Sequence, residues 1–331
     1  MIDVITIGSA LVDIFIDTDR PESGNKICYP IGGKFLVKDL KFSTGGGGLN
    51  SAVALSKLGV RTGFLGGIGN DKNGEIILKE LRKNKVKFIG TISKKSTGFS
   101  VILDTREKHR TILTNKGASD HLNFNKLKLR KLKTKWFRFS SMEKDSHNTE
   151  IKLANFAKKN KIKICFAPSM YQLIKGIKPV KNILKKTDLL ILNKEEASML
   201  VKKGDILKGL HKLGPKIVCI TDGEKEVIVS DKKYKYRAKP QKVKATEKTG
   251  AGDAFSSAFL AGLIKKNDIG VAIKAGILNA QSTIQKFGSK NGLLTRLEIL
   301  KKLTLTSIKI KKETIWKLNL IQYWKKEKQS T

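Results

Sequence analysis

The alternation of apolar and polar segments predicts a large α/β domain built on a mostly parallel sheet. From residue 136 onward, short apolar runs alternate with longer segments of helical periodicity. This order is typical of parallel strands joined by crossover helices that cover both faces of a doubly wound sheet. Ligands of such sheets bind at the carboxyl ends of the strands. The expected strands are residues 136–139, 162–166, 189–192, 217–221 and 227–230, and the expected helices are 148–159, 174–184, 254–264 and 269–287.

The first third of the chain contains several predicted strands with few helices between them. Residues 2–7 and 10–17 are two apolar runs separated by Gly8-Ser9, and residues 96–104 and 111–115 predict a hairpin. Residues 63–69 predict a further buried strand, followed by a helix over 75–83. Asp13 stands alone among apolar neighbours, so it is either a turn residue at a strand edge or a polar group that faces a cleft.

The segment Gly250-Ala251-Gly252-Asp253 has the composition of a turn that opens a helix. A small, apolar run with high helix propensity begins immediately after it. A helix N-terminus offers unpaired N–H groups and the positive end of the dipole, and glycine lets a phosphate approach the backbone closely. Asp253 therefore either stabilises the helix dipole or accepts a proton from a hydroxyl that attacks a bound phosphate.

A second glycine-rich segment, residues 45–48, is followed by Asn50 and a helical pattern. Such a run is either a flexible loop or a backbone-lined pocket that Asn50 closes. Another polar segment, Asn193-Lys194-Glu195-Glu196, follows a predicted strand; on its own it is a helix cap with a favourable acid in the first turn.

Composition limits the class of protein. The chain has 331 residues, 40% of them hydrophobic, which indicates a globular protein. Its three cysteines have no metal-ligand spacing. No signal-peptide pattern precedes the first predicted strand and no apolar run reaches ~18 residues, so we expect a cytoplasmic protein without a membrane span.

The net charge of +38 comes mostly from lysine. Nucleic-acid binding is one explanation. The lysines are scattered over all predicted helices and loops and few aromatic residues interleave with them, which favours a solvated basic surface instead. Either explanation allows long-range attraction of ATP and other anions.

Two motifs together resemble those of one enzyme family. Thr249-Gly250-Ala251-Gly252-Asp253 resembles the C-terminal signature of the ribokinase-like (PfkB) family of carbohydrate and nucleoside kinases, and residues 45–52 resemble its N-terminal signature in spacing and position. The resemblance runs to about residue 303. It implies a doubly wound, mostly parallel sheet with helices on both faces and a small β-lid from about residues 9–42 and 96–117. Beyond it, residues 304–331 are expected to form a basic C-terminal extension.

The resemblance also implies ATP-dependent phosphorylation of a hydroxyl on a sugar or sugar-like molecule. Asp253 would be the general base, and the backbone of Gly250, Ala251 and Gly252 would form an anion hole. Asn193 and Glu196 would organise Mg²⁺, mostly through its waters, because Mg²⁺ prefers oxygen ligands and keeps several waters. A monovalent cation is also implied, although the acid and threonine that often begin the C-terminal signature are here Glu247 and Lys248.

Further binding residues are implied position by position. The expected acceptor contacts are Asp13, Gly46, Gly47, Asn50, Phe99, Arg110 and Glu143, and the expected nucleotide contacts are Asn193, Thr221, Gly223, Thr249, Asn279 and Gly288. Gly47 stands where ribokinases proper have a lysine, which weakens the transfer of ribose specificity. Phe99, Arg110 and Glu143 are also compatible with an ordinary hairpin or loop surface, and Asn279 with a helix core.

Two alternatives to a sugar kinase stay open. A P-loop NTPase and a dinucleotide dehydrogenase are unsupported because neither glycine motif occurs in the sequence. A nucleoside kinase of the same family is the nearest rival. A catalytically idle, basic nucleic-acid-binding or scaffold protein is a rival of another class, favoured only by the charge. We expect a homodimer and ATP plus a small acceptor as ligands.

Overall fold

A ten-stranded mixed sheet forms the centre of the molecule in the computed structural model, which describes residues 1–24, 26–107 and 109–315. The strand order is β16-β15-β14-β13-β12-β11-β10-β1-β4-β6, parallel from β13 to β6 and antiparallel from β13 to β16. The bounds are β1 Val4–Ile7, β4 Thr62–Leu65, β6 Lys87–Phe88, β10 Trp136–Ser140, β11 Lys163–Ala167, β12 Leu189–Asn193, β13 Ile217–Asp222, β14 Glu226–Ser230, β15 Tyr234–Ala238 and β16 Ile310–Thr314.

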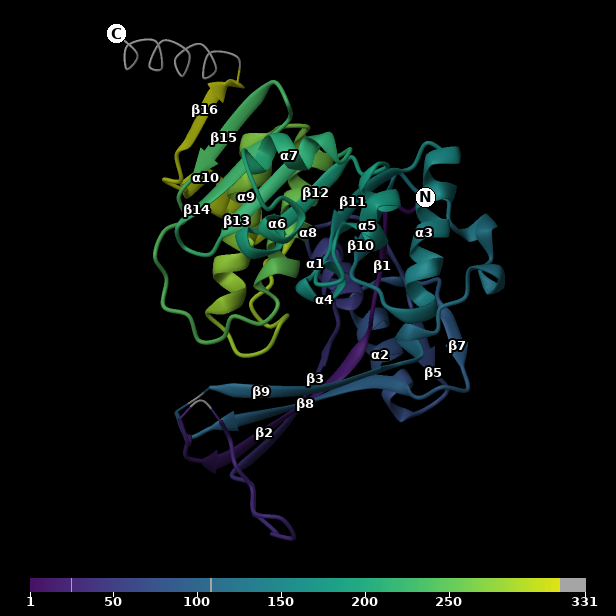
Figure 1. Ribbon diagram of the computed structural model, residues 1–331, viewed down its shortest axis with the longest axis vertical. Coiled ribbons are helices and arrows are strands. Elements are labelled where there is room, and N and C mark those ends of the chain that lie inside the picture. Colours follow the sequence, from purple (N-terminus) through teal and green to yellow (C-terminus); the bar gives the residue numbers. More distant parts are fainter. Residues whose placement is uncertain (25, 108, 316–331) are drawn as a thin grey trace.

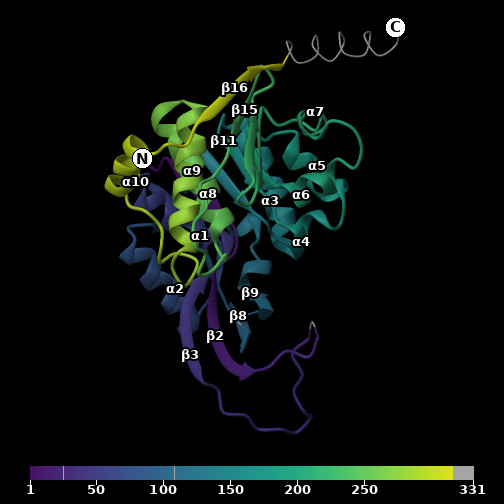
Figure 2. The same cartoon turned by 90° about the vertical axis from the view of Figure 1, so that its left-hand side faces the viewer.

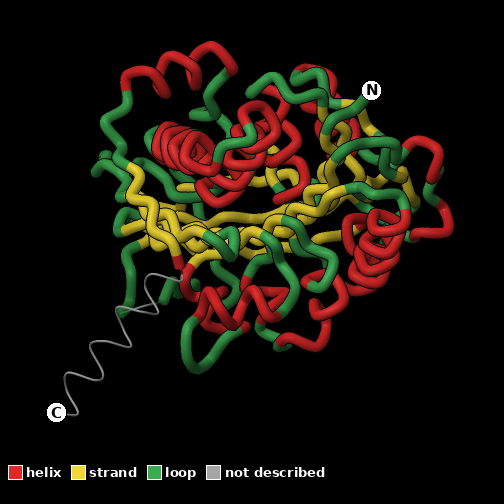
Figure 3. Tube along the Cα trace, turned by 90° about the horizontal axis from the view of Figure 1, so that it is seen from above, coloured by secondary structure: helices red, strands yellow, loops and turns green. Residues whose placement is uncertain are grey.

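Helices cover both faces of this sheet (Figures 2 and 3). One face packs on α1, α8, α9 and α10, and the other on α3, α5, α6 and α7, each through its own cluster of buried side chains. The doubly wound prediction is therefore confirmed. The bounds are α1 Gly47–Lys57, α2 Lys72–Lys83, α3 Lys144–Lys159, α4 Met170–Leu173, α5 Ile177–Leu184, α6 Lys194–Leu200, α7 Ile206–Lys212, α8 Ala251–Lys266, α9 Ile269–Ile284 and α10 Arg296–Leu305, with short 3-10 turns at Ala118–Asp120, Phe124–Lys126 and Leu129–Lys131.

A separate four-stranded sheet projects from one end of the main body (Figure 1). Its order is β3-β2-β8-β9, with bounds β2 Leu11–Arg20, β3 Asp39–Gly45, β8 Thr97–Thr105 and β9 Arg110–Gly117. Strand β2 pairs in parallel with β8, and β8 and β9 form the antiparallel hairpin expected from the sequence. We call these four strands the projecting sheet.

Two predicted elements are divided in the structure. Residues 63–69 were expected as one strand, but β4 ends at Leu65 and β5 (Gly67–Gly69) pairs with β7 (Thr91–Ser93) in a sheet of their own. The helix expected over 174–184 begins only after Gly176, which has a φ of 79° and separates α4 from α5. Glycine adopts this left-handed conformation without steric cost, so it interrupts a helix at little expense.

The chain returns to the main sheet after the expected boundary at residue 303. That position lies inside α10, and β16 then pairs antiparallel with β15, while Ile308 is buried. The part of the 304–331 segment up to residue 315 is thus an edge of the main sheet. The rest of that segment, residues 316–331, lies outside the described residues. Within the described ranges, no helix has both the length and the apolarity needed to cross a membrane.

Candidate active site

The turn before α8 presents backbone N–H groups at the carboxyl edge of the main sheet. Gly250 has a φ of 82°, and a β-carbon there would lie 2.6 Å from the carbonyl oxygen of Ser289, so only glycine fits. The N–H of Ala251 donates to the carbonyl of Lys248 at 3.3 Å, whereas no acceptor in the described part of the chain takes the N–H groups of Gly252 and Asp253. The N–H of Gly250 also has no acceptor among the described residues, so of the three expected anion-hole donors Gly250 and Gly252 are free and Ala251 is not, while Asp253 adds a further free N–H.

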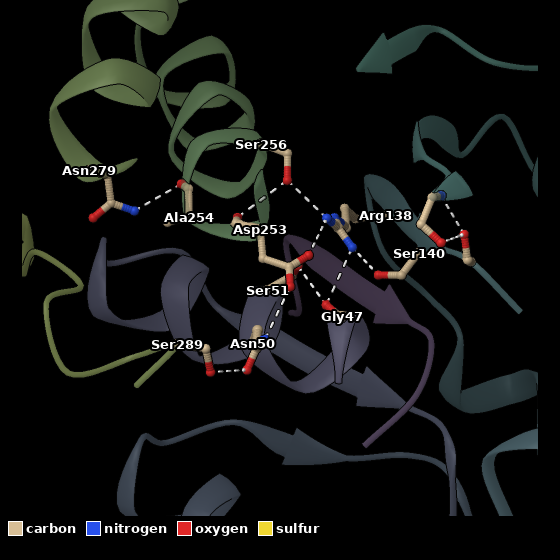
Figure 4. Close-up of polar contacts among 12 residues, drawn as sticks. Gly47, Asn50, Ser51, Arg138, Ser140, Asp253, Ala254, Ser256, Asn279 and Ser289 are labelled. Carbon is tan, nitrogen blue, oxygen red and sulfur yellow. Dashed lines mark hydrogen bonds and ion pairs between the residues drawn. The ribbon is translucent and has the colours of Figure 1, made fainter. Parts of the chain in front are cut away.

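Asp253 lies where the two glycine-rich segments meet (Figure 4). Its Oδ2 accepts a hydrogen bond from Nδ2 of Asn50 at 3.1 Å, across 203 residues of sequence. Its Oδ1 accepts from Nη2 of Arg138 at 3.1 Å and from Oγ of Ser51 at 3.4 Å. A β-carbon at Gly47 would lie 3.5 Å from Asp253 Oδ1 and 3.0 Å from Ser140 Oγ, so glycine lets the start of α1 approach this carboxylate closely.

Arg138 was not anticipated from the sequence. It lies within β10 and its side chain is only 1% exposed. Its guanidinium also donates to Oγ of Ser256 at 2.9 Å, to the carbonyl of Gly47 at 3.4 Å and to Ser140. The signal in the sequence was a lone arginine inside an apolar strand, because a buried charge of this kind requires a partner.

Lys290 is a second buried cation that the sequence analysis did not identify. Its Nζ donates to the carbonyl of Thr44 and, at 3.3 Å, to Oδ1 of Asn50. Burial lowers the pKa of Lys290 to about 8, although nearby carboxylates, including those of Asp13 and Asp253, oppose this shift. Asn50 is thus held from both ends, with its amide nitrogen on Asp253 and its oxygen on Lys290.

A cavity of about 770 Å³ lies between the main body and the projecting sheet. On the side of the main body, the cavity is lined by Gly46, Gly47, Asn50 and Asp253. On the opposite side, it is lined by the inward face of β2, β8 and β9. Asp13 faces this cavity from β2. Burial raises the pKa of Asp13, and the charge of Lys290 and a hydrogen bond with Ser100 offset only part of this rise.

The cations that line this cavity are already paired with carboxylates. Lys116 Nζ lies 2.7 Å from Oε2 of Glu143, and Lys144 Nζ lies 3.1 Å from Oδ2 of Asp120. Burial alone would raise the pKa of Glu143, but hydrogen bonds and charges of Lys116 and Lys175 outweigh it, so the pKa is lowered. The cavity therefore combines paired charges with many hydroxyl and amide groups.

A smaller cavity of about 250 Å³ opens on the other side of Asp253. Both cavities share Ala167, Ser169 and Asp253 as lining residues, so this carboxylate stands between them. The lining of the smaller cavity also includes Arg138, Asn193, Glu196, Thr221, Gly250 and Gly252. A β-carbon at Gly252 would have no atom within 4 Å, which leaves open space beside the free N–H groups.

Asn193 and Glu196 line the smaller cavity as a capping box at the start of α6. The side chain of each accepts from the backbone N–H of the other, both at 2.8 Å. Burial raises the pKa of Glu196, and backbone hydrogen bonds from Asn193 and Met170 offset part of the rise. No group of three or more His, Cys, Asp or Glu side chains suited to a metal occurs among the described residues. The amide and carboxylate oxygens of Asn193 and Glu196 at this cavity are of the kind that Mg²⁺ prefers, and Mg²⁺ keeps several of its own waters.

Two expected acceptor contacts lie elsewhere. Phe99 is on the outer face of β8, because side chains alternate along a strand; Ser100 and Ile102, on the other face, line the large cavity. Arg110 lies outside that cavity. Its Nη1 donates to Oε1 of the buried Glu247 at 2.6 Å and to Oγ1 of Thr249 at 3.3 Å. Arg110 thus ties β9 to the segment that leads into the α8 turn.

Four expected nucleotide contacts, Gly223, Thr249, Asn279 and Gly288, do not line the smaller cavity. Asn279 is fully buried: its Nδ2 donates to the carbonyl of Ala254 and its Oδ1 accepts from the N–H of Leu294, both at 2.9 Å. It holds α9 against α8 and has no exposed surface for a base. The N–H of Gly288 donates to Glu247 Oε2 at 2.7 Å. Gly223 occupies the β13–β14 turn, and Thr249 lines the large cavity.

Comparisons with known proteins agree with this geometry. The chain is 28% identical to a ribokinase of Lactococcus lactis over 308 residues, which cover 92% of this chain and 97% of the relative. It is also 28% identical to an ATP-dependent 6-phosphofructokinase of Thermoanaerobacterium thermosaccharolyticum, covering 83% and 85% of the two chains. These relatives span almost the whole described domain.

Solved structures show the same fold. A ribokinase from Thermotoga maritima superposes with a TM-score of 0.79 at 23% identity, covering 92% of this chain and all of the other. An adenosine kinase from Sinorhizobium meliloti gives a TM-score of 0.76 at 19% identity, covering 91% and 99%. Residues 1–296 match the pfkB family of carbohydrate kinases. The resemblance inferred from two motifs is therefore confirmed, and the chain belongs to the pfkB carbohydrate kinase family.

Proposed function

We propose that this protein transfers the γ-phosphoryl group of ATP to a hydroxyl of an unphosphorylated sugar or similar polyol. The observation that carries the proposal is the position of Asp253 between the two cavities. A sugar in the large cavity and phosphates in the small one would meet at this carboxylate. The free N–H groups of Gly252 and Asp253 would face the transferring group.

In the proposed reaction, Asp253 accepts the proton of the acceptor hydroxyl while the hydroxyl oxygen forms a bond to the γ-phosphorus. The bond from that phosphorus to the β–γ bridging oxygen breaks, and ADP leaves with the electron pair. Asn50 and Arg138 hold the carboxylate in place through the hydrogen bonds described above. The Gly252 and Asp253 N–H groups stabilise charge on the transferring group. Mg²⁺, when bound, would neutralise phosphate charge, with its waters held by Asn193 and Glu196.

The lining of the large cavity supports an acceptor rich in hydroxyl groups and without a charge of its own. Asp13 and Asp253 are hydrogen-bond acceptors, and Asn115 and Ser141 add neutral polar groups. Lys116 and Lys144 are already paired with the carboxylates of Glu143 and Asp120. A phosphate or carboxylate on the acceptor would have to displace these carboxylates before it could bind the lysines. This disfavours a sugar phosphate as acceptor.

We further propose that the projecting sheet is the lid of the acceptor cavity and that the kinase domain extends beyond residue 303 to include β16. A nucleoside is the second candidate acceptor. Leu11, Phe15, Ile102 and Ile112 line the cavity from the projecting sheet and could pack against a base. The expectations of a cytoplasmic homodimer and of a monovalent cation remain proposals on the family likeness alone.

The test is a coupled assay of Mg²⁺-dependent ADP formation with ribose, fructose, fructose 6-phosphate, 5-dehydro-2-deoxygluconate, adenosine and cytidine. The expected result is turnover of one unphosphorylated sugar, with a phosphorylated product, and collapse of turnover in Asp253→Asn. Turnover of adenosine or cytidine instead would favour the second candidate. Preference for fructose 6-phosphate would contradict the argument from the paired lysines.

A basic scaffold protein would instead bind RNA or DNA at physiological salt and turn over none of these acceptors. Its binding would weaken steeply with added salt, because it would rest on contacts with phosphates.

A further inference from the structure

A buried polar cluster between α3 and α4 has no part in the proposed reaction. Glu150 of α3 is fully buried, and Gln172 of α4 is 3% exposed. Gln172 Nε2 donates to Glu150 Oε2 at 2.6 Å, and Nδ1 of His147 lies 3.2 Å from the same oxygen. Oε1 of Glu150 has no hydrogen-bond partner among the described residues, so the carboxylate depends on these two contacts. Nε2 of His147 lies 3.2 Å from the carbonyl of Pro179, which adds α5 to the cluster.

These contacts are satisfied best when His147 and Glu150 share a proton. A carbonyl only accepts hydrogen bonds, so Nε2 of His147 carries a hydrogen that points to Pro179. Nδ1 and Glu150 Oε2 then bond to each other only if one of them is protonated, as imidazolium with carboxylate or as imidazole with carboxylic acid. Loss of that proton leaves two acceptors and a fully buried charge, with only the Gln172 amide, 3.0 Å from Nδ1, to serve both.

Folding strengthens the hold of both groups on their protons. The hydrogen bond with Glu150 raises the pKa of His147, and burial opposes this rise without cancelling it. Burial raises the pKa of Glu150, although hydrogen bonds with His147 and Gln172 offset part of the rise. Lys175, which lies between α4 and α5 and pairs with Glu143 at 3.5 Å, favours the neutral imidazole. The stability that His147 contributes is therefore complete below its ordinary pKa of 6.5 and is lost as the pH rises through the higher pKa of the folded chain.

The short helix α4 belongs to the wall of the large cavity. Ser169, just before α4, lines both cavities, and Tyr171 lines the large one. The ring of Tyr171 lies 5.3 Å from Nζ of Lys116, which comes from β9 of the projecting sheet. A helix of four residues has little stability of its own, so its position depends on what holds it. The buried Leu173 provides an apolar contact with the core, and Gln172 provides the polar contact with the cluster.

We propose that His147, Glu150 and Gln172 position α4 against the large cavity, and that α4 is held less tightly once His147 and Glu150 lose their shared proton. The acceptor would then bind more weakly at high pH. The effect on the acceptor rests on the proposed function, whereas the effect on α4 does not. The competing explanation is a buried polar contact without a shared proton. It predicts that α4 is held equally well at every pH from about 6.5 to about 9.

Hydrogen exchange of the full chain, measured by mass spectrometry of peptides that contain α4, tests the proposal. The reporting amides are those of Ile174 and Gly176, which donate to the carbonyls of Met170 and Leu173. After correction for the intrinsic effect of pH on exchange, we expect their protection to fall ~10-fold between about pH 6.5 and about pH 9, because a charge-assisted hydrogen bond is lost. Peptides of α9, on the opposite face of the main sheet, should keep their protection. Constant protection of α4 in the unmodified protein would overturn the proposal, and this result needs no variant.

Three variants separate the shared proton from the polar contact. Glu150→Gln keeps the size of the side chain and removes the shared proton, so the protection of α4 should no longer depend on pH. Gln172→Leu removes the contact with α4 and should lower protection equally across the range. The matched control is His121→Asn, which removes an exposed imidazole paired with Asp145 and should behave like the unmodified protein. A pH dependence that persists in Glu150→Gln or disappears in His121→Asn would contradict the proposal.

Steady-state kinetics provide the second measurement. We expect KM for the acceptor to rise over the same pH range in the unmodified protein, by more than KM for ATP, and to stay constant in Glu150→Gln. A constant acceptor KM while the protection of α4 falls would overturn the connection to the cavity. If the protein phosphorylates none of the acceptors, the proposed function fails, and hydrogen exchange still decides whether the cluster controls α4.

Discussion

The two ends of the large cavity are built in different ways. At the Asp253 end, the side chains of Asn50, Arg138 and Lys290 are buried and hydrogen-bonded to one another or to Asp253. At the other end, half-exposed strands of the projecting sheet contribute apolar residues and Asp13, and the charged groups form pairs such as Lys116 and Glu143.

This difference suggests that one end of the cavity positions the reacting groups and that the other end selects the acceptor. A carboxylate held by several buried partners has one orientation, which suits chemistry that depends on position. Strand faces contribute single side chains that can be exchanged without disturbing the turn before α8, which suits the choice of acceptor. Substitutions at the Asp253 end should therefore lower kcat, and substitutions on the projecting sheet should raise KM for the acceptor.

The largest effect is expected for Asp253→Asn. Loss of the proton acceptor should lower kcat ~10²- to 10⁴-fold, with little change in KM for either substrate. Steady-state kinetics on the accepted sugar measure this. The control is Asp145→Asn, because Asp145 lies in the first turn of α3, is 72% exposed and has His121 as its ion-pair partner among the described residues. A near-normal kcat in Asp253→Asn would contradict the inference that substitutions at the Asp253 end act on kcat and those on the projecting sheet act on KM.

A smaller effect is expected for Asp13→Ala. Each hydrogen bond to a charged group contributes about 1.5–3 kcal/mol, so kcat/KM for the acceptor should fall roughly 10- to 100-fold, mainly through KM, with KM for ATP unchanged. The matched control is Phe99→Leu, on the outer face of β8, which should leave acceptor KM unaltered. If Phe99→Leu raises acceptor KM as strongly as Asp13→Ala, the assignment of the strand faces is wrong.

The turn at Gly250–Asp253 and the glycine-rich segment before Asn50 could be predicted from the sequence because their signals are local. Gly250 and Gly252 mark a tight turn before a helical run, and Asn50 follows a glycine run in the same way. The α/β alternation predicted a parallel sheet with crossover helices for the same reason. Turn and helix-start signals of this kind can be interpreted from neighbouring residues alone, without knowing which distant segments pack against them.

The remaining parts of the site depend on contacts between distant segments. Arg138 is an isolated cation in an apolar strand, and its partner lies 115 residues away. Phe99 and Ser100 are neighbours, so a prediction of which one faces the cavity needs the register of β8 against β2, which the hairpin pattern alone does not set. Asn279 is a polar residue on a helix, and only the packing of α9 on α8 shows that backbone groups satisfy it.

The Arg110–Glu247 ion pair connects the two ends and should show a modest coupling. Arg110 is 25% exposed and Glu247 only 1%. In a double-mutant cycle of Arg110→Gln and Glu247→Gln, we expect a coupling free energy of about 1–2 kcal/mol in denaturant unfolding. Acceptor KM should rise more in Arg110→Gln than in Arg61→Gln, a surface arginine paired with Asp3. Strict additivity in the cycle would show that β9 and the α8 turn are independent.

The smallest effect is expected for Lys290, the buried lysine whose Nζ donates to Oδ1 of Asn50. The pKa of Lys290 is lowered from 10.5 to about 8 in the folded protein. Between these two values the unfolded chain binds more protons than the folded one, so the free energy of unfolding should rise with pH, by roughly 1 kcal/mol between pH 8 and pH 9. Below pH 8 the lysine is charged in both states and its burial disfavours folding in full.

Urea unfolding at each pH measures this rise, and Lys290→Met should abolish it while Lys79→Met, on the exposed side of α2, should not. A pH dependence that persists in Lys290→Met would mean that another group titrates there. The free energy of unfolding would then not depend on the charge of Lys290 in this pH range.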